Sequence, residues 1–365
     1  MRMFIPGRQL SEQFYWQAVR PQLNTHFPEL QHAAALIDSG SEVLGFDDDL
    51  STDHHWGPRV LLFLSETDHT SYAERMQTML AHELPYEFMG YSTNFTPPLI
   101  EEGVTQLLQA ITEGPINHRV TLQTVRGFVQ GYLNYDMTQP LEVADWLTFP
   151  EQKLRTLTQG PVFYDGIGLE AGRGRFTYYP DDVWLYQLAA AWTRISQEEH
   201  LMGRAGLAGD ELGSAIIGAR LVRDVMRLWF LMHRTYAPYP KWFGTAFKQL
   251  PDAENLAPLL QQVFQAETWP EREAYLVPAY EMLACQHNKL GLTGPVTTQV
   301  TTFFNRPFRV ITFNGVVGAL EGQIQDERVK RLLARPRIGG IDLFSDSTDL
   351  LAYEEWRPQL RSLFI

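Results

Sequence analysis

Hydrophobic periodicity changes near the middle of the chain, and this change limits the possible folds more than any other sequence feature. Before Pro150, short apolar runs alternate with helical stretches, whereas from Pro180 onward apolar residues recur mostly at helical spacing. The change predicts an α+β domain followed by a helical domain. We place the boundary in the segment 165–180, around the glycine-rich string GIGLEAGRGRF, which gives domains of 1–175 and 176–365.

The first domain is predicted to hold a small mixed sheet with flanking helices. Its run VLLFL is apolar at every position, so we expect both faces of that strand to be covered. The expected elements are helices over 9–27, 71–83 and 99–113, strands at 32–37, 59–64, 118–125 and 161–165, and an extended segment at 86–95. In the second domain we expect helices over 181–201, 207–236, 254–266, 270–289 and 312–335.

Composition and charge exclude several classes of protein. The 365 residues carry 43 acids against 30 bases, a formal charge of -13, so we expect no extended DNA binding. Cys285 is the one cysteine, which excludes an internal disulfide and a multi-cysteine zinc site and favours the cytoplasm. The start of the chain lacks the apolar region of a signal peptide, and no apolar run is long enough to span a bilayer, so we expect no membrane partner.

The string GSEVLGFDDDLSTDHHWGPRVLLFL, residues 40–64, carries the strongest chemical pattern. A strand that ends in Gly-Ser can offer backbone N–H groups and a hydroxyl to phosphate, which makes Gly40 and Ser41 candidate nucleotide-binding residues. Metal-assisted phosphoryl transfer needs ligands for Mg²⁺ or Mn²⁺, and residues spaced i, i+2 on one strand point the same way. Asp53 and His55 have this spacing, so we predict both as catalytic, metal-binding residues. Arg59 is either a phosphate ligand or a surface residue.

The Gly-Ser pattern, followed by Asp53-His54-His55 before an apolar strand, resembles the polymerase-beta-like nucleotidyltransferase superfamily. Together with YYPDDVWLYQLAAAWTRISQEE and YAPYPKWFGTAF, the string resembles the uncharacterised nucleotidyltransferase-like family called domain of unknown function four thousand and thirty-seven. The resemblance implies transfer of a nucleoside monophosphate, AMP by default, from a metal-bound nucleoside triphosphate to a hydroxyl-type acceptor. That acceptor stays open between a small molecule, a protein side chain and an RNA end.

The chain departs from the superfamily pattern at the metal-binding acids. His55 stands where the second acid is expected, and neutral imidazole suits Zn²⁺ or Mn²⁺ better than Mg²⁺. In HRVTLQTV, Thr121 stands where a third acid is usual. The run Asp47–Asp49 either compensates or forms a solvated turn. These departures leave open a second hypothesis, a catalytically silent nucleotide-binding or regulatory protein.

Other side chains are candidates for the same chemistry. Asp165, after the strand PVFYD, resembles an acid of related antibiotic nucleotidyltransferases and is a catalytic candidate that contacts the acceptor or the metal. Arg220, Arg223 and Arg227 fall at i, i+3 and i+7, so they share one helix face. The three form either a triphosphate clamp or an ion-pair network between domains. Lys241 is a further nucleotide-binding candidate.

Two further patterns have alternative interpretations. Arg227 and His233 match the Arg-x-x-x-x-x-His spacing of helical ribonuclease domains that accompany nucleotidyltransferases, in which the two residues activate a ribose hydroxyl. Alternatively, His233 caps carbonyls at a helix end. The aromatic residues of YAPYPKWF and FTYYPDDVW either stack on a base or acceptor or pack in the core.

Overall fold

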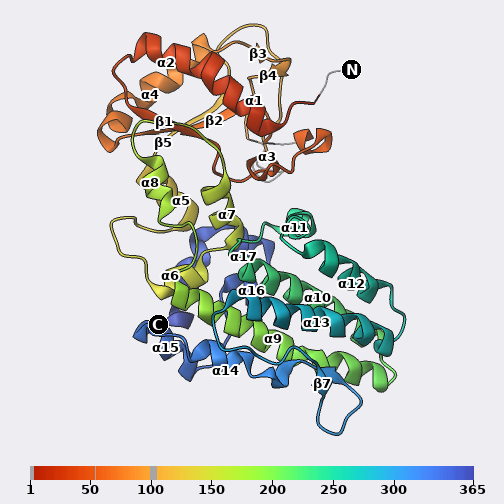
Figure 1. Cartoon of the computed structure of the whole chain (residues 1–365). Helices are drawn as coiled ribbons and strands as arrows, with labels where there is room; N and C mark the ends of the chain where they lie inside the picture. The colour runs from red at the N-terminus through yellow and green to blue at the C-terminus, as the bar shows by residue number, and fades with distance from the viewer. Residues whose placement is uncertain (1–3, 54, 99–104) are drawn as a thin grey trace. The chain divides into compact units, whose positions relative to one another are not determined.

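The computed structural model describes residues 4–53, 55–98 and 105–365 (Figure 1). The chain divides into two compact units, Met1–Pro140 with Lys153–Thr177, and Leu141–Gln152 with Tyr178–Ile365. Residues 141–152 belong to the second unit although they precede the predicted boundary at residue 175. The later crossing, between Thr177 and Tyr178, lies two residues from that boundary.

A four-stranded mixed sheet forms the centre of the first unit, with the strand order β5-β2-β1-β6. The strands are β1 (His32–Ala35), β2 (Arg59–Leu64), β5 (Arg119–Thr124) and β6 (Val162–Asp165). Strand β1 runs antiparallel to both β2 and β6, and β2 runs parallel to β5. The predicted mixed sheet is therefore confirmed.

Helices cover both faces of this sheet, and β2 is accordingly buried at every position and apolar at all but Arg59. On one face, Leu62 and Val120 share a core with Phe14 and Met76. On the other, the rings of Phe63 and Phe128 lie 5.5 Å apart. The helices of this unit are α1 (Gly7–Phe14), the π-helical η1 (Tyr15–Val19), α2 (Arg20–His26), α3 (Ser41–Leu44), η2 (Asp49–Asp53), α4 (Glu66–Glu83), α5 (Val125–Leu133), α8 (Leu169–Gly174) and α7 (Glu151–Gln159), whose residues 151–152 belong to the second unit.

The predicted helix over 99–113 is not observed where the structure describes it. Residues 99–104 lie outside the described residues, and residues 105–113 contain no helix. Leu108 instead pairs with Phe95 in an antiparallel bridge, close to the short strands β3 (Glu87–Phe88) and β4 (Tyr91–Ser92) in sequence. The backbone N–H of Thr96 donates to the carbonyl of Leu107 at 2.8 Å, so these groups are satisfied in extended pairing.

The second unit is largely helical, as the sequence predicts. The helices α9, α10 and α13 pack together, with α12 and α14 against this group (Figure 1). The helices are α6 (Val143–Thr148), α9 (Asp181–Leu207), α10 (Glu211–Met232), α11 (Pro240–Phe247), α12 (Ala253–Gln265), α13 (Trp269–Leu290), α14 (Val316–Glu321), α15 (Glu327–Lys330), α16 (Ile341–Phe344), α17 (Thr348–Ala352) and α18 (Arg357–Arg361), with 3-10 turns η4 (Thr312–Asn314), η5 (Arg331–Ala334), η6 (Glu354–Trp356) and η7 (Ser362–Phe364) and a hairpin of β7 (Thr301–Thr302) and β8 (Arg309–Val310). Of the helices described, none is both long and apolar enough to cross a bilayer.

The predicted single helix over 312–335 is wrong, because the segment breaks into four short pieces. The break follows Gly322, where Asp182 accepts the backbone N–H of Gln325 at 2.8 Å. Asp326 then accepts the N–H of Arg328 and starts α15. Side chains satisfy these N–H groups in place of a continuous helix.

Candidate functional site

Three strands of the first unit bring polar residues to one end of the sheet. Since β1 runs antiparallel to β2, the residues after β1 lie at the end where β2 and β5 begin. Arg59 and Arg119 are the first residues of β2 and β5, and they are opposite each other in the register. We call Asp38, Glu42, His55, Arg59 and Arg119 the sheet-end cluster.

Arg59 is the buried centre of this cluster, so its interpretation as a surface residue is wrong. Its guanidinium lies 2.8 Å from the Asp38 carboxylate and 2.6 Å from that of Glu42, and Nη2 donates to the Ser39 carbonyl. Burial alone lowers the pKa of Arg59, but the two carboxylates outweigh burial and raise it. Burial also raises the pKa of Glu42, against the attraction of Arg59.

Gly40 lies in the turn that Arg59 holds, directly before Ser41 at the start of α3. Its φ is 146°, a value that side chains rarely adopt. A Cβ at this position would lie 2.6 Å from Nη2 of Arg59 and 2.6 Å from Oε2 of Glu42. Glycine is required because the buried ion pair occupies the space beside it.

Asp53 and His55 do not lie on a strand, so the prediction that they share one strand face is wrong. Asp53 ends the 3-10 helix η2, and β2 begins only at Arg59. His55 has a left-handed φ of 54°, and its backbone N–H donates to the carbonyl of Gln106 at 2.9 Å. Gly57 packs against Phe95 before the strand begins, so the i, i+2 geometry of a strand does not apply to Asp53 and His55. Their metal-binding roles remain predictions.

His55 joins the sheet-end cluster through Arg119. The guanidinium Nη1 of Arg119 lies 2.8 Å from Nδ1 of His55, and a guanidinium can only donate. Nδ1 therefore accepts, and a neutral His55 ring carries its proton on Nε2. Neither ring nitrogen then has a lone pair for a metal, and the adjacent guanidinium repels a divalent cation. In this arrangement His55 does not fit the role of a metal ligand.

Arg119 differs from Arg59 in how its charge is balanced. The side chain is half-buried, with its guanidinium carbon 5.6 Å from the centre of the Phe95 ring. Burial, together with repulsion from Arg59, lowers the pKa of Arg119 to about 10. The guanidinium still carries its proton at neutral pH, and no described carboxylate forms an ion pair with it.

The acids of the run Asp47–Asp49 that have described contacts serve the local fold. The Asp47 carboxylate accepts the backbone N–H of Gly7 at 2.6 Å and the indole N–H of Trp56 at 2.9 Å. Asp48 accepts the N–H groups of Leu50 and Ser51 at 3.1 Å, as in a turn. Among residues 4–53, 55–98 and 105–365, no three His, Cys, Asp or Glu side chains form a group suited to a metal ion.

Asp165 ends β6 and caps the helix that follows. Its carboxylate accepts the backbone N–H groups of Ile167, Gly168, Leu169 and Glu170, at 3.2, 2.8, 2.9 and 2.9 Å. Burial opposes the ionised form, but these four donors outweigh it and lower the pKa of Asp165. The carboxylate is thus engaged by the backbone at the start of α8, and its catalytic role remains a prediction.

The arginines predicted as a clamp all form ion pairs within the second unit. Arg220 pairs with Glu198, Arg223 with Asp346 at 2.7 Å, and Arg227 with Asp342 at 4.0 Å. The structure therefore contains an ion-pair network on this helix face, inside one unit and not between domains. Lys241 lies in the first turn of α11, with Nζ 5.0 Å from the centre of the Trp242 ring. Nucleotide binding by these side chains remains a prediction.

A buried pair of acids in the second unit was not predicted. The backbone N–H of Glu151 donates to Asp342 at 2.9 Å, and the Glu151 carboxylate accepts from Ala237 N–H at 2.8 Å and from the Tyr179 hydroxyl at 3.4 Å. Burial, then the charge of Asp342, raises the pKa of Glu151 to about 7. Glu151 and Asp342 are 191 positions apart, so no local spacing could reveal them.

His233 and the aromatic residues of the two motifs also form contacts within the protein. His233 Nδ1 lies 2.8 Å from the Trp229 carbonyl, so His233 caps a carbonyl at the end of α10, as the second interpretation predicted. Tyr179 and Tyr236 are buried with ring centres 5.2 Å apart, and the Trp184 indole donates to the Leu231 carbonyl at 2.7 Å. The aromatic residues of the two motifs therefore pack mainly in the core of the second unit.

Residues 146–243 match the family model described as "Domain of unknown function (DUF4037)". The chain is also similar to a solved nucleotidyltransferase-like protein from Exiguobacterium sibiricum 255-15, with 11% identity, 78% of each chain covered and a TM-score of 0.32. No curated protein matches the sequence. The match over residues 146–243 agrees with the DUF4037 resemblance predicted from the sequence.

Proposed function

We propose that the sheet-end cluster binds the phosphate group of a nucleotide. The observation that supports this most directly is Arg119, a half-buried cation with no described carboxylate partner and a pKa lowered to about 10. A phosphate would supply a direct anionic partner for Arg119 and form charge-assisted hydrogen bonds with its guanidinium. Gly40 and Ser41 follow the strand that ends beside Arg59, so backbone groups and a hydroxyl are near the same end of the sheet.

The first candidate function is binding of a nucleoside triphosphate without transfer, in a regulatory protein. His55, where the superfamily has an acid, accepts from Arg119, and Asp47 and Asp48 support the local fold. The donor set beside Asp53 therefore does not fit a catalytic Mg²⁺ or Mn²⁺. The resemblance implies recognition of a nucleotide. A phosphate site at Arg119 would provide this recognition without a metal.

The second candidate is the transferase that the resemblance implies, which moves AMP from a nucleoside triphosphate to a small-molecule, protein or RNA hydroxyl. Asp53 favours it, since this acid has the expected spacing from Gly40 and Ser41. This candidate requires the His55 ring to leave Arg119. It also requires Arg220, Arg223 and Arg227 to leave their carboxylates if they are to hold the triphosphate. The cytoplasmic location stays a prediction in both cases.

Calorimetric titration with each of the four nucleoside triphosphates, with and without Mg²⁺ or Mn²⁺, tests the proposal when combined with an assay of pyrophosphate release. We expect binding without turnover, and a loss of about tenfold to a hundredfold in affinity in Arg119→Gln. The matched control is Arg126→Gln, in the same unit, which removes an exposed ion pair with Asp136. Absence of binding would reject both candidates.

His55→Asp separates the two candidates, because it introduces the carboxylate that the superfamily pattern has two residues after Asp53. Pyrophosphate release by the native protein would establish the transferase. Release with Mg²⁺ in His55→Asp alone would mean that the native chain binds nucleotide but lacks a required acid. We expect the second result.

A further inference from the structure

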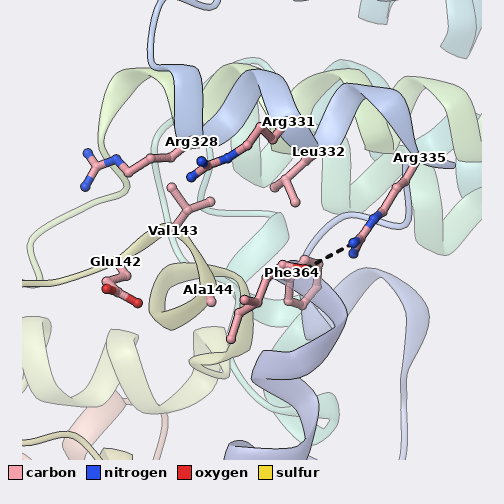
Figure 2. Close-up of a pocket in the computed structure, with 9 residues that line it drawn as sticks. Glu142, Val143, Ala144, Arg328, Arg331, Leu332, Arg335 and Phe364 are labelled. Carbon is pink, nitrogen blue, oxygen red and sulfur yellow. Dashed lines mark hydrogen bonds between the residues drawn. The ribbon is translucent and has the colours of Figure 1, made fainter.

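Two cavities of the second unit differ in the charge of their linings. The first, of about 460 Å³, lies beside α15 and η5 and is lined by three arginines and one glutamate (Figure 2). Arg328 pairs with Asp326 at 2.6 Å, and Arg331 attracts the same carboxylate. Arg335 donates to an oxygen of Ile365 at 3.1 Å. The protein itself therefore engages the arginines of this cavity.

The second cavity, of about 410 Å³, lies along one face of α13. Its lining includes Pro278, Glu281, Met282 and Cys285, which are spaced at i, i+3, i+4 and i+7 and so share a helix face. The start of α12 and the segment before β7 contribute further side chains. The volume is in the range of small-ligand sites, about 300 to 1,000 Å³.

Glu281 is the carboxylate of this lining that lacks a cation. The lining holds two carboxylates and one ammonium, and that ammonium, Nζ of Lys289, pairs with Asp252 at 3.2 Å. Glu281 is half-buried and forms no ion pair within the part of the chain that the structure describes. Its Oε1 accepts the backbone N–H of Val300 at 3.4 Å, which is a neutral donor. The lining therefore carries one negative charge in excess.

Neutral side chains of the same lining offer further hydrogen-bond acceptors. The side chains of Gln286, Thr298 and Gln299 form no hydrogen bond with other described residues. Each carries an oxygen that can accept. An ammonium group has three N–H donors, so a carboxylate together with neutral oxygens can satisfy all of them. Pro278 and Met282 are apolar and half-buried, and they provide a surface for the rest of a ligand.

We propose that this cavity binds a small organic primary amine, with its ammonium at Glu281 and its apolar body against Pro278 and Met282. The ammonium supplies the positive charge that the lining lacks, and the Met282 thioether packs well against an aromatic ring. The charge of Glu281 repels an anionic ligand. The cavity belongs to the second unit and the sheet-end cluster to the first, so this proposal does not depend on nucleotide binding.

Calorimetric titration with phenethylamine tests this proposal, because the probe joins a primary ammonium to an aromatic ring. We expect a Kd of about 1 mM or below, and a loss of about tenfold or more in Glu281→Gln. Glu281 has no ion pair to lose among the described residues, so this variant should retain the native thermal unfolding temperature. Glu267→Gln is the matched control, since Glu267 is an exposed glutamate of the same unit outside the lining.

Two further probes test which part of the ligand is recognised. Phenethyl alcohol has the ring without the charge, and phenethyltrimethylammonium has the charge without N–H donors. We expect each to bind about tenfold more weakly than phenethylamine. Equal binding of the alcohol would overturn the role of Glu281, and equal binding of the trimethylated cation would overturn the assignment to a primary amine.

Cys285 locates the bound ligand, because it is the one cysteine of the sequence, is exposed and lines the cavity. We expect saturating phenethylamine to slow the reaction of this thiol with DTNB, followed by absorbance, in the native protein. The same concentration should have little effect in Glu281→Gln. The proposal is overturned if phenethylamine does not bind, if Glu281→Gln and Glu267→Gln have equal effects, or if the bound amine leaves the reaction rate of Cys285 unchanged.

Discussion

Arg59 in the first unit is buried with two carboxylates, whereas Glu151 in the second unit is buried beside another acid, Asp342. In the first case opposite charges compensate each other, so the arginine stays charged. In the second case burial and the like charge of Asp342 raise the pKa of Glu151, although Arg227 opposes the shift. The comparison shows that the partners of a buried ionisable group decide whether it remains charged or holds a proton.

Arg59→Ala should have the largest effect, because it leaves Glu42 buried without its cation and removes the partner of Asp38. We expect the free energy of unfolding to fall by about 3 to 5 kcal/mol, measured by urea denaturation. Arg126→Ala, which removes an exposed ion pair of the same unit, should cost about 0 to 1 kcal/mol. A similar small loss in both variants would contradict a compensated buried arginine.

Gly40→Ala tests the ion pair of Arg59 and Glu42 by adding a methyl group next to it. The new Cβ would be forced against Arg59 and Glu42 at a φ of 146°, so we expect a loss of about 2 to 4 kcal/mol in the same denaturation experiment. Gly114→Ala is the control for backbone strain alone, because its φ is 83° but no atom lies within 4 Å of the added Cβ. Equal losses in the two variants would mean that Arg59 does not occupy the space beside Gly40.

Because the pKa of Glu151 is raised, we expect the stability of the folded protein to fall as the pH rises. Its pKa is raised from 4.5 to about 7, so the folded state binds a proton more tightly than the unfolded chain does. The contribution is therefore present below pH 4.5 and is lost as the pH rises through 7, with a size of about 3 kcal/mol. Glu151→Gln should flatten this part of the pH profile of unfolding. An unchanged slope would show that Glu151 does not hold the proton.

Asp165 should show the opposite pH dependence and the smallest effect. Four backbone N–H groups lower its pKa, so its stabilising contribution is present above the ordinary aspartate pKa and is lost as the pH falls. Asp165→Asn should cost about 1 kcal/mol at pH 7, as for loss of a helix cap, and the difference from the native protein should shrink in acid. A constant difference down to pH 2 would contradict the ionised cap.

Several predictions about the site from the sequence were incomplete because they depend on contacts between residues that are distant in sequence. The spacing of Asp53 and His55 matched the superfamily pattern, but β2 begins only at Arg59, and the guanidinium of Arg119 donates to Nδ1 of His55. Arg59 looked like a surface residue because its partners Asp38 and Glu42 precede it by 21 and 17 positions, across a turn. Such pairings depend on strand register and burial, which a single sequence does not display.

The sequence by itself determined the local elements and the class of fold. The all-apolar string VLLFL and the helical periodicity after Pro180 are properties of neighbouring residues, so the strand at 59–64 and the helices α9, α10, α12 and α13 were predictable. Tertiary structure alone decided which charges meet. Glu151 and Asp342 come together across 191 positions, and Arg119 receives its neighbour Arg59 from strand pairing, because burial and electrostatics act through space and not along the chain.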